Sequence, residues 1–193
     1  MSEVQKLTTA SVLSLFSYNG LYVVAYGWLF GMSLWISFFG GVIAYRTLPR
    51  AQFGALQHKT FPVYFVLSIA LGSTLLGLWT LDHPVVLTHY ASPLVADVFQ
   101  AYTLISVILS QASNYFVVGP LTSKTMFERM RMEKDEGKTY NESGVSDKMK
   151  ALNRRFGMLH GVSSLANLGA VIALGFHGLW IGNAGIGNAG LKL

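Results

Sequence analysis

The last apolar segment of the chain carries polar side chains along one face. His160, Ser163, Ser164 and Asn167 follow one another at helical spacing, which places them on one side of a helix. An imidazole, two hydroxyls and an amide can bind a polar ligand, or they can hydrogen-bond to neighbouring helices. The pattern alone leaves both interpretations open: a binding site, or the seam where this helix meets its neighbours.

Catalytic and metal-binding patterns are weak in this chain. The sequence contains no G-x-S-x-G, H-E-x-x-H, phosphate-binding or dinucleotide-binding motif, and it has no cysteine. The histidines do not pair three or four residues apart. His83 and His89, near Asp82, are separated by a proline and are not a helical ligand set. We therefore expect no enzymatic activity, no cofactor and no metal ion.

The composition is that of an integral membrane protein. Of the 193 residues, 52% are hydrophobic and only 12% are charged, and the mean hydropathy is +0.44. Soluble domains carry about 25% charged residues. The formal charge is +5, but the basic residues flank apolar segments and form no patch interleaved with aromatic residues. We therefore expect membrane lipids as surroundings and no nucleic-acid partner.

Four apolar segments are long enough to cross a bilayer, which takes about 20 residues in a helix. The predicted fold class is an all-α membrane protein, a four-transmembrane-helix bundle. Its transmembrane domain covers residues 21–181, with spans at about 21–45, 61–81, 96–118 and 156–181. Small residues four apart in these spans, such as Gly27 with Gly31 and Gly157 with Gly161, predict closely packed helices.

Both ends of the chain are expected outside the spans. A single helix from Val12 to Tyr45 would be about 51 Å long, too long for one simple span. We therefore expect a break near residues 17–20 and a short interfacial helix at about 4–16, within an N-terminal segment 1–20. A cleaved signal peptide is the alternative, although the start of the chain lacks its basic region. Residues 182–193, which contain a repeat of IGNAG, are expected to form a flexible lumenal tail.

The basic residues predict the orientation. Three Lys and Arg residues lie in the first loop, 46–60, and nine in the third loop, 119–155, out of 14 in the chain. Positive residues favour the cytoplasmic side, so both loops should be cytosolic and both termini lumenal. The sequon Asn141-Glu142-Ser143 lies in the third loop and should therefore carry no glycan.

The third loop should contain a helix over residues 120–136, ended by Gly137. It has a narrow apolar strip at Met126, Phe127 and Met130. Two ion pairs are possible four residues apart, Arg129 with Glu133 and Arg131 with Asp135. This helix either lies along the membrane as a solvated linker or docks a partner. The segment after it, 138–146, is expected to be flexible.

Three blocks of the sequence resemble the transmembrane protein 205 family. The first is the turn Arg46-x-Leu-Pro-Arg50 with the residues up to Pro62, the second begins at Asn114, and the third is His160-Gly161 with Asn167. The resemblance implies a four-span protein of eukaryotic endomembranes, linked to vesicular secretion and without established enzymatic activity. It also implies a link to platinum-drug resistance through cysteine sulfur, which a chain without cysteine does not provide.

The predicted orientation places the first loop, the end of the third span and the front of the fourth span at one depth. A polar cluster at this cytosolic level should either hold an anionic headgroup or join the helices to one another. Its residues are Arg46, Arg50, Asn114, His160, Ser164 and Asn167.

The expected function is that of an accessory or scaffold subunit of a membrane complex in the secretory pathway, for example in the endoplasmic reticulum. Its partner would be another membrane protein or a second copy of the chain. The alternative is a transporter or binding bundle for a small molecule or lipid, which needs a cavity that opens to one side.

Overall fold

The computed structural model describes residues 6–187, and the regular elements within that range are all helices, with no strand. The elements are α1 (Thr9–Leu13), α2 (Tyr18–Leu34), η1 (Trp35–Gly40), α3 (Gly41–Thr47), α4 (Arg50–Asp82), α5 (Val85–Thr88), α6 (Ala96–Ser113), η2 (Asn114–Val118), α7 (Gly119–Glu136) and α8 (Asp147–Ala184), where η denotes a π-helical turn. The predicted all-α fold is thereby confirmed.

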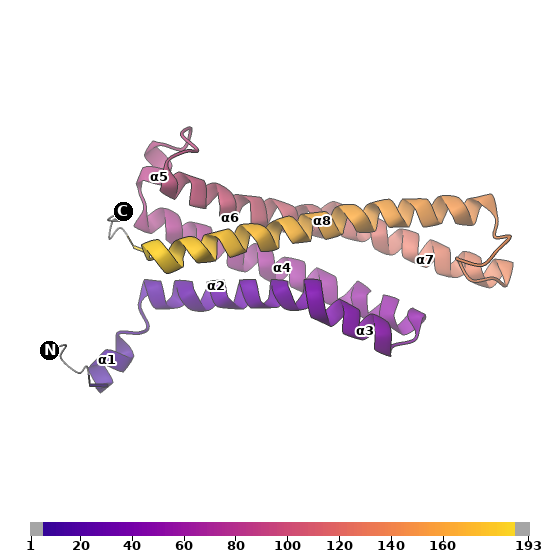
Figure 1. Ribbon diagram of the computed structural model, residues 1–193, viewed down its shortest axis with the longest axis horizontal. Coiled ribbons are helices and arrows are strands. Elements are labelled where there is room, and N and C mark those ends of the chain that lie inside the picture. Colours follow the sequence, from indigo (N-terminus) through magenta and orange to yellow (C-terminus); the bar gives the residue numbers. More distant parts are fainter. Residues whose placement is uncertain (1–5, 188–193) are drawn as a thin grey trace.

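Four continuous helices are long and apolar enough to cross a membrane, and the chain is accordingly an integral membrane protein. They cover Tyr18–Thr47, Arg50–Asp82, Ala96–Glu136 and Asp147–Ala184. Figure 1 shows them side by side, with the start of α2 and the end of α8 at the same end of the molecule. The three longest measure about 50–60 Å, against a hydrocarbon core of about 30 Å. Each predicted span lies inside one of these helices. The helices continue past the predicted spans mainly at the end of the molecule that lies away from the start of α2 and the end of α8.

The start of the chain turns before the first span. α1 is only five residues long, shorter than the predicted 4–16, whose first two residues lie outside the described range. Thr8 caps α1 by accepting the N–H of Ser11 at 3.1 Å, and Ser17 caps α2 by accepting the N–H of Gly20 at 3.2 Å. The break between the two helices therefore lies close to the predicted place. A Cβ at position 20 would overlap the carbonyl oxygen of Leu15, so this turn requires glycine.

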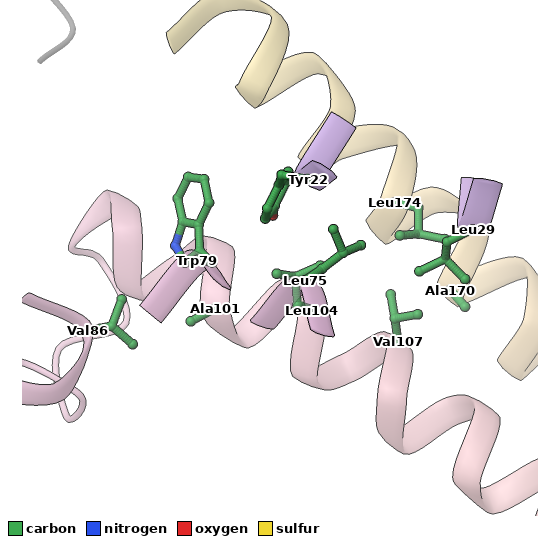
Figure 2. Packing of buried hydrophobic residues seen from close by; sticks show 10 residues of the cluster. All are labelled: Tyr22, Leu29, Leu75, Trp79, Val86, Ala101, Leu104, Val107, Ala170 and Leu174. Atoms are coloured by element: carbon green, nitrogen blue, oxygen red, sulfur yellow. The ribbon is translucent and has the colours of Figure 1, made fainter. Parts of the chain in front are cut away.

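An apolar core fills the half of the bundle that lies nearest to the start of α2. Figure 2 shows side chains of α2, α4, α5, α6 and α8 meeting there. The cluster consists of Tyr22, Leu29, Leu75, Trp79, Val86, Ala101, Leu104, Val107, Ala170 and Leu174. The outer surface is also apolar, with Trp28 and Leu165 more than half exposed. An apolar surface is what a bundle presents to lipid, because lipid tails are as apolar as the core itself.

The small residues that recur four apart do not all lie between helices. A Cβ at Gly72 would lie 3.1 Å from Ile108, so this glycine lets α4 approach α6. In contrast, no atom lies within 4 Å of a Cβ built at Gly27, Gly31, Gly157 or Gly161. The prediction that these four glycines bring helices of the same chain together is therefore wrong. They face the outside of the bundle.

α7 continues the third span instead of lying along the membrane. It follows α6 and η2 without a break and runs on in nearly the same direction, beside α8 (Figure 1). A Cβ at Gly54 of α4 would lie 3.0 Å from the sulfur of Met126, so α4 packs closely on α7. Gly137 ends the helix with a φ of 63°, as predicted. The predicted pairs of Arg129 with Glu133 and of Arg131 with Asp135 are absent from the described residues. Glu133 binds Arg50 instead of Arg129.

Hydrogen bonds hold the connection between α7 and α8, which was predicted to be flexible. Glu142 accepts the N–H of Thr139 at 3.0 Å and its hydroxyl at 2.7 Å, and these bonds hold the pKa of the Glu142 carboxyl below its usual value. Ser146 donates to Glu136 and accepts the N–H of Met149, which caps α8. α8 therefore begins at Asp147 and not near 156. It extends through Ala184, into the predicted tail, of which residues 188–193 lie outside the described range.

Candidate functional site

Next to the apolar core, all four long helices contribute a buried polar side chain to one layer. These residues are at most 7% exposed, and we call them the polar layer: Ser33, Tyr64, Gln111, Asn114 and Asn167. Most of them follow a core residue at helical spacing, such as Gln111 after Val107 and Ser33 after Leu29. On the side of the apolar core away from the termini, the interior of the bundle therefore contains polar side chains from all four long helices.

Hydrogen bonds run through the polar layer from α2 to α6. Tyr64 Oη donates to Ser33 Oγ at 3.2 Å, and Ser33 Oγ donates to the carbonyl of Leu29 at 2.7 Å. Gln111 Nε2 donates to Tyr64 Oη at 3.4 Å. Bonds of this kind between membrane helices contribute on average about 0.6 kcal/mol each. They fix which side chains face one another more than they stabilise the bundle.

Asn114 extends the polar layer to α8. Its Nδ2 donates to the carbonyl of Ser163 at 3.3 Å and to Asn167 Oδ1 at 3.5 Å. A backbone carbonyl can only accept, and this fixes the orientation of the Asn114 amide. Asn114 Oδ1 and Gln111 Oε1 are consequently buried acceptors without a donor among the described residues. Such an atom costs about 1–3 kcal/mol, so the layer is suited to a group that donates hydrogen bonds.

π-helical turns occur in two of the four helices next to the polar layer. η1 begins shortly after Ser33, and η2 begins at Asn114. The N–H of Gly119 bonds the Asn114 carbonyl five residues back. A Cβ at position 119 would lie only 2.6 Å from that oxygen, so glycine permits the turn. π-helical turns occur often at functional sites, which makes the polar layer the best candidate site in the bundle.

The structure brings together two of the six residues predicted to form one cluster. Asn114 and Asn167 meet in the polar layer, whereas Ser164 and Arg46 are exposed. His160 is also exposed and stacks on Phe156, with ring centroids 5.8 Å apart. His160 shares a helix face with Asn167, but seven residues, or about 10 Å, separate them along α8. A shared face therefore does not place them in one site.

The sixth predicted residue, Arg50, belongs to a second cluster in the helical extension beyond the spans. Its guanidinium pairs with Glu133 of α7 and lies 4.1 Å from the centre of the Tyr140 ring. Arg129, which is 6% exposed, lies 4.2 Å from the same ring and 4.5 Å from the Phe156 ring. Together these five residues tie α4, α7 and α8 to the connecting turn, and we call them the arginine–tyrosine lock.

The Tyr140 ring contacts both arginines of the arginine–tyrosine lock, so its removal should loosen the helical extension. Tyr140→Ala loses two cation–π contacts, each contributing about 0.5–2 kcal/mol, and we expect a stability lower by about 1–3 kcal/mol. Trypsin should then cleave after Lys138 several times faster in detergent-solubilised protein. Tyr140→Phe keeps the ring and should behave much like the wild type. Equal sensitivity of the two variants would show that the ring contacts do not hold the turn.

A third polar group, near the end of α8, was not predicted from the sequence. His177 is fully buried, where it contacts the hydroxyl of Tyr22 and bonds Gln100 Oε1 at 2.8 Å. His83 stacks on Trp79 with centroids 3.9 Å apart, and its Nε2 lies 3.9 Å from Asp97. A lone histidine near the end of an apolar run was the only signal for this group in the sequence.

The histidines considered as metal ligands do not converge. His89 is exposed and contacts Thr88 at 2.9 Å, whereas His83 is buried against Trp79. Within residues 6–187, no three His, Cys, Asp or Glu side chains gather closely enough to hold a metal ion. The polar layer, the arginine–tyrosine lock and the group around His177 therefore join helices to one another by hydrogen bonds and ion pairs.

Comparisons with known proteins agree with the family resemblance. A family model described as "Domain of unknown function (DUF4149)" matches residues 24–131, more than half of the chain. Transmembrane protein 205 from Danio rerio is 27% identical over 161 residues, which cover 77% of this chain and 81% of that protein. No solved structure matches the chain.

Proposed function

The chain belongs to the DUF4149 family, and from this premise we propose that it is a non-enzymatic accessory or scaffold subunit of a membrane complex in the secretory pathway, for example in the endoplasmic reticulum. The helical extension supports this proposal most strongly. α4 and α7 continue about 20–30 Å beyond the part of each helix needed to cross the bilayer. The arginine–tyrosine lock holds these extended helices together. A rigid extension beyond the bilayer is suited to holding another protein.

Within the bilayer, the outward-facing glycines support a partner helix or a second copy of the chain. Gly27 and Gly31 lie on α2, and Gly157 and Gly161 lie on α8, with open space in front of each. Glycines four apart let two helix backbones approach closely. No helix of the same chain packs on these glycines, so a helix of a partner or of a second copy can pack there.

We also propose that residues 46–60 and 119–155 face the cytosol and that both termini are lumenal. In a eukaryotic cell, Asn141 should then carry no glycan, and peptide N-glycosidase should leave the mobility of the wild-type protein unchanged. Lys6→Asn creates the sequon Asn-Leu-Thr at the other end of the bundle and should gain a glycan. A glycan on Asn141 with none on the Lys6→Asn variant would invert this orientation.

Native mass spectrometry of the endogenous protein, extracted in a mild detergent, tests the proposed function. The accessory-subunit function predicts a protein partner, or a second copy, at a defined stoichiometry. A chain that runs alone and retains one specific lipid or small molecule would contradict it.

A binding bundle for a lipid or small molecule is the second candidate function. It is favoured by the two buried acceptors of the polar layer, Gln111 Oε1 and Asn114 Oδ1, which lack donors among the described residues. A ligand with hydroxyl or ammonium groups would supply them. In that case the retained molecule should be lost from Asn114→Ala but kept by His160→Ala, because His160 lies outside the layer.

A further inference from the structure

One face of α7 is exposed and strongly basic. Its residues follow one another at spacings of three and four, which is one side of a helix. We call it the basic face, and it consists of Lys124, Phe127, Arg131 and Lys134. Lys138 is also exposed and lies just past Gly137, which ends the helix. Phe127 is 45% exposed in the midst of these cationic side chains. The opposite side of α7 carries the buried Thr125 and Arg129 and packs toward α8.

The positive charge of the basic face is largely uncompensated within the chain. Lys124, Arg131 and Lys134 make no ion pair or side-chain hydrogen bond among the described residues, and Lys138 donates to the carbonyl of Gly144 at 3.1 Å. Three acidic groups nearby are engaged elsewhere: Glu133 with Arg50, Glu136 with Ser146 and Glu142 with Thr139. Two further carboxylates on α7, Glu128 and Asp135, make no ion pair with the basic face among the described residues.

Two hollows lie along this face, and Phe127 lines both. One has a volume of about 680 Å³ and lies between α7, the start of α4 and the turn after α7. Ala51 and Met130 are its apolar lining, and its charged lining is three cations, Arg131, Lys134 and Lys138, with the two engaged carboxylates of Glu133 and Glu142. The other has a volume of about 310 Å³ and is lined by Lys124, Phe127, Glu128 and Arg131. Apolar surface beside cationic side chains suits a ligand that combines apolar groups with carboxylates.

The position of the basic face relative to the bilayer decides whether its ligand is a lipid or a protein. About 20 residues from Ala96 cross the hydrocarbon core, so the core ends near residue 116. Phe127 is then about 16 Å beyond it and Lys134 about 27 Å, because α7 continues the direction of α6. The headgroup region adds only about 5–8 Å on each side, and attraction to anionic lipid decays within about 8 Å. Most of the basic face is therefore out of reach of the membrane.

We propose that the basic face binds an acidic amphipathic helix of a partner protein. Apolar side chains of that helix would cover Phe127 and Met130, and its carboxylates would pair with Lys124, Arg131 and Lys134. The face is about 15 Å long from Lys124 to Lys134, which matches about three turns of a helix. Recognition by apolar anchors in a groove, oriented by opposite charge, is a common mode of helix binding. This inference rests on the proposed accessory-subunit function and names the contact that would serve it.

Site-specific photo-crosslinking in native membranes tests this inference. A benzophenone amino acid is placed at Phe127, and at Lys148 of α8 as an exposed basic control in the same extension. After illumination, the crosslinked peptide is sequenced by mass spectrometry. We expect Phe127, but not Lys148, to capture one protein segment with Asp or Glu and apolar residues at helical spacing.

Charge reversal provides the second arm of the test. R131E combined with K134E should lower the crosslinking yield from Phe127 about tenfold or more, whereas R131K with K134R, and K148E with K150E, should leave it nearly unchanged. Crosslinks to lipid, to a segment without acidic residues, or equally from Lys148 would overturn the inference, as would a yield unaffected by charge reversal. If native mass spectrometry still finds a stoichiometric partner on the charge-reversed protein, only this inference fails. A wild-type protein without any partner would instead contradict the proposed function.

Discussion

Replacing Trp79 by alanine should lower the free energy of unfolding by about 3–5 kcal/mol, the range for truncating a buried aromatic residue. Trp79 is 1% exposed and packs in the apolar core. Its ring stacks on His83, and its Nε1 donates to the carbonyl of Asp97 at 2.9 Å. The substitution removes a large core side chain and a contact between α4 and α6 together. It also leaves the buried His83 without its stacking partner.

Trp28→Ala is the matched control, because Trp28 lies on α2 and is 57% exposed. Thermal unfolding in one detergent, followed by circular dichroism, compares the two variants directly. We expect a large loss of stability for Trp79→Ala and a change of less than about 1 kcal/mol for Trp28→Ala. Similar losses in both variants would contradict the placement of the core.

Gly119→Ala should also be strongly destabilising, by about 1–3 kcal/mol. The new methyl group would lie 2.6 Å from the backbone oxygen of Asn114, and a backbone atom cannot move aside as a flexible side chain can. Either η2 reverts to a regular helix, or α6 and α7 shift against each other. Both responses displace Asn114 from its partners on α8.

Gly77→Ala serves as the control for this substitution. Gly77 lies within α4, and no atom is within 4 Å of the position of its Cβ. Alanine there should be neutral or should stabilise the protein by about 0.5–1 kcal/mol. The same unfolding assay distinguishes the two variants, and a neutral Gly119→Ala would show that the π-helical turn tolerates a side chain.

The number of spans and the all-helical fold followed from the sequence because both depend on local properties. A run of about 20 apolar residues can satisfy its backbone in lipid only as a helix or within a closed barrel. Gly137 was recognisable as a helix end for a similarly local reason, since its positive φ suits glycine. The extensions of α4 and α8 beyond the predicted spans were missed because their polar residues contribute nothing to an apolar run. The helix over residues 120–136 was predicted, but not that it continues the third span.

The candidate site was only partly predictable. Asn114 and Asn167 stood out as amides in apolar segments, but their pairing depends on how α6 and α8 cross. Tyr64 and Gln111 also belong to the polar layer, but no pattern in the sequence distinguished them. The Arg50–Glu133 pair joins residues 83 positions apart, and local spacing instead suggested Arg129 as the partner of Glu133. Contacts between distant segments decided these cases.

The proposed function requires a bundle that is closed at the polar layer and interacts through its surface, and cysteine accessibility tests this most directly. The chain has no cysteine of its own, so a single introduced thiol reports alone. Ser33→Cys and Ser68→Cys place it at buried positions within the bundle, and Lys134→Cys places it on the basic face. We predict that a water-soluble maleimide in native membranes labels Lys134→Cys readily and labels the two buried positions only after denaturation. Rapid labelling of Ser33→Cys and Ser68→Cys in the folded protein would reveal a water-filled path into the bundle and would contradict the scaffold function in favour of transport.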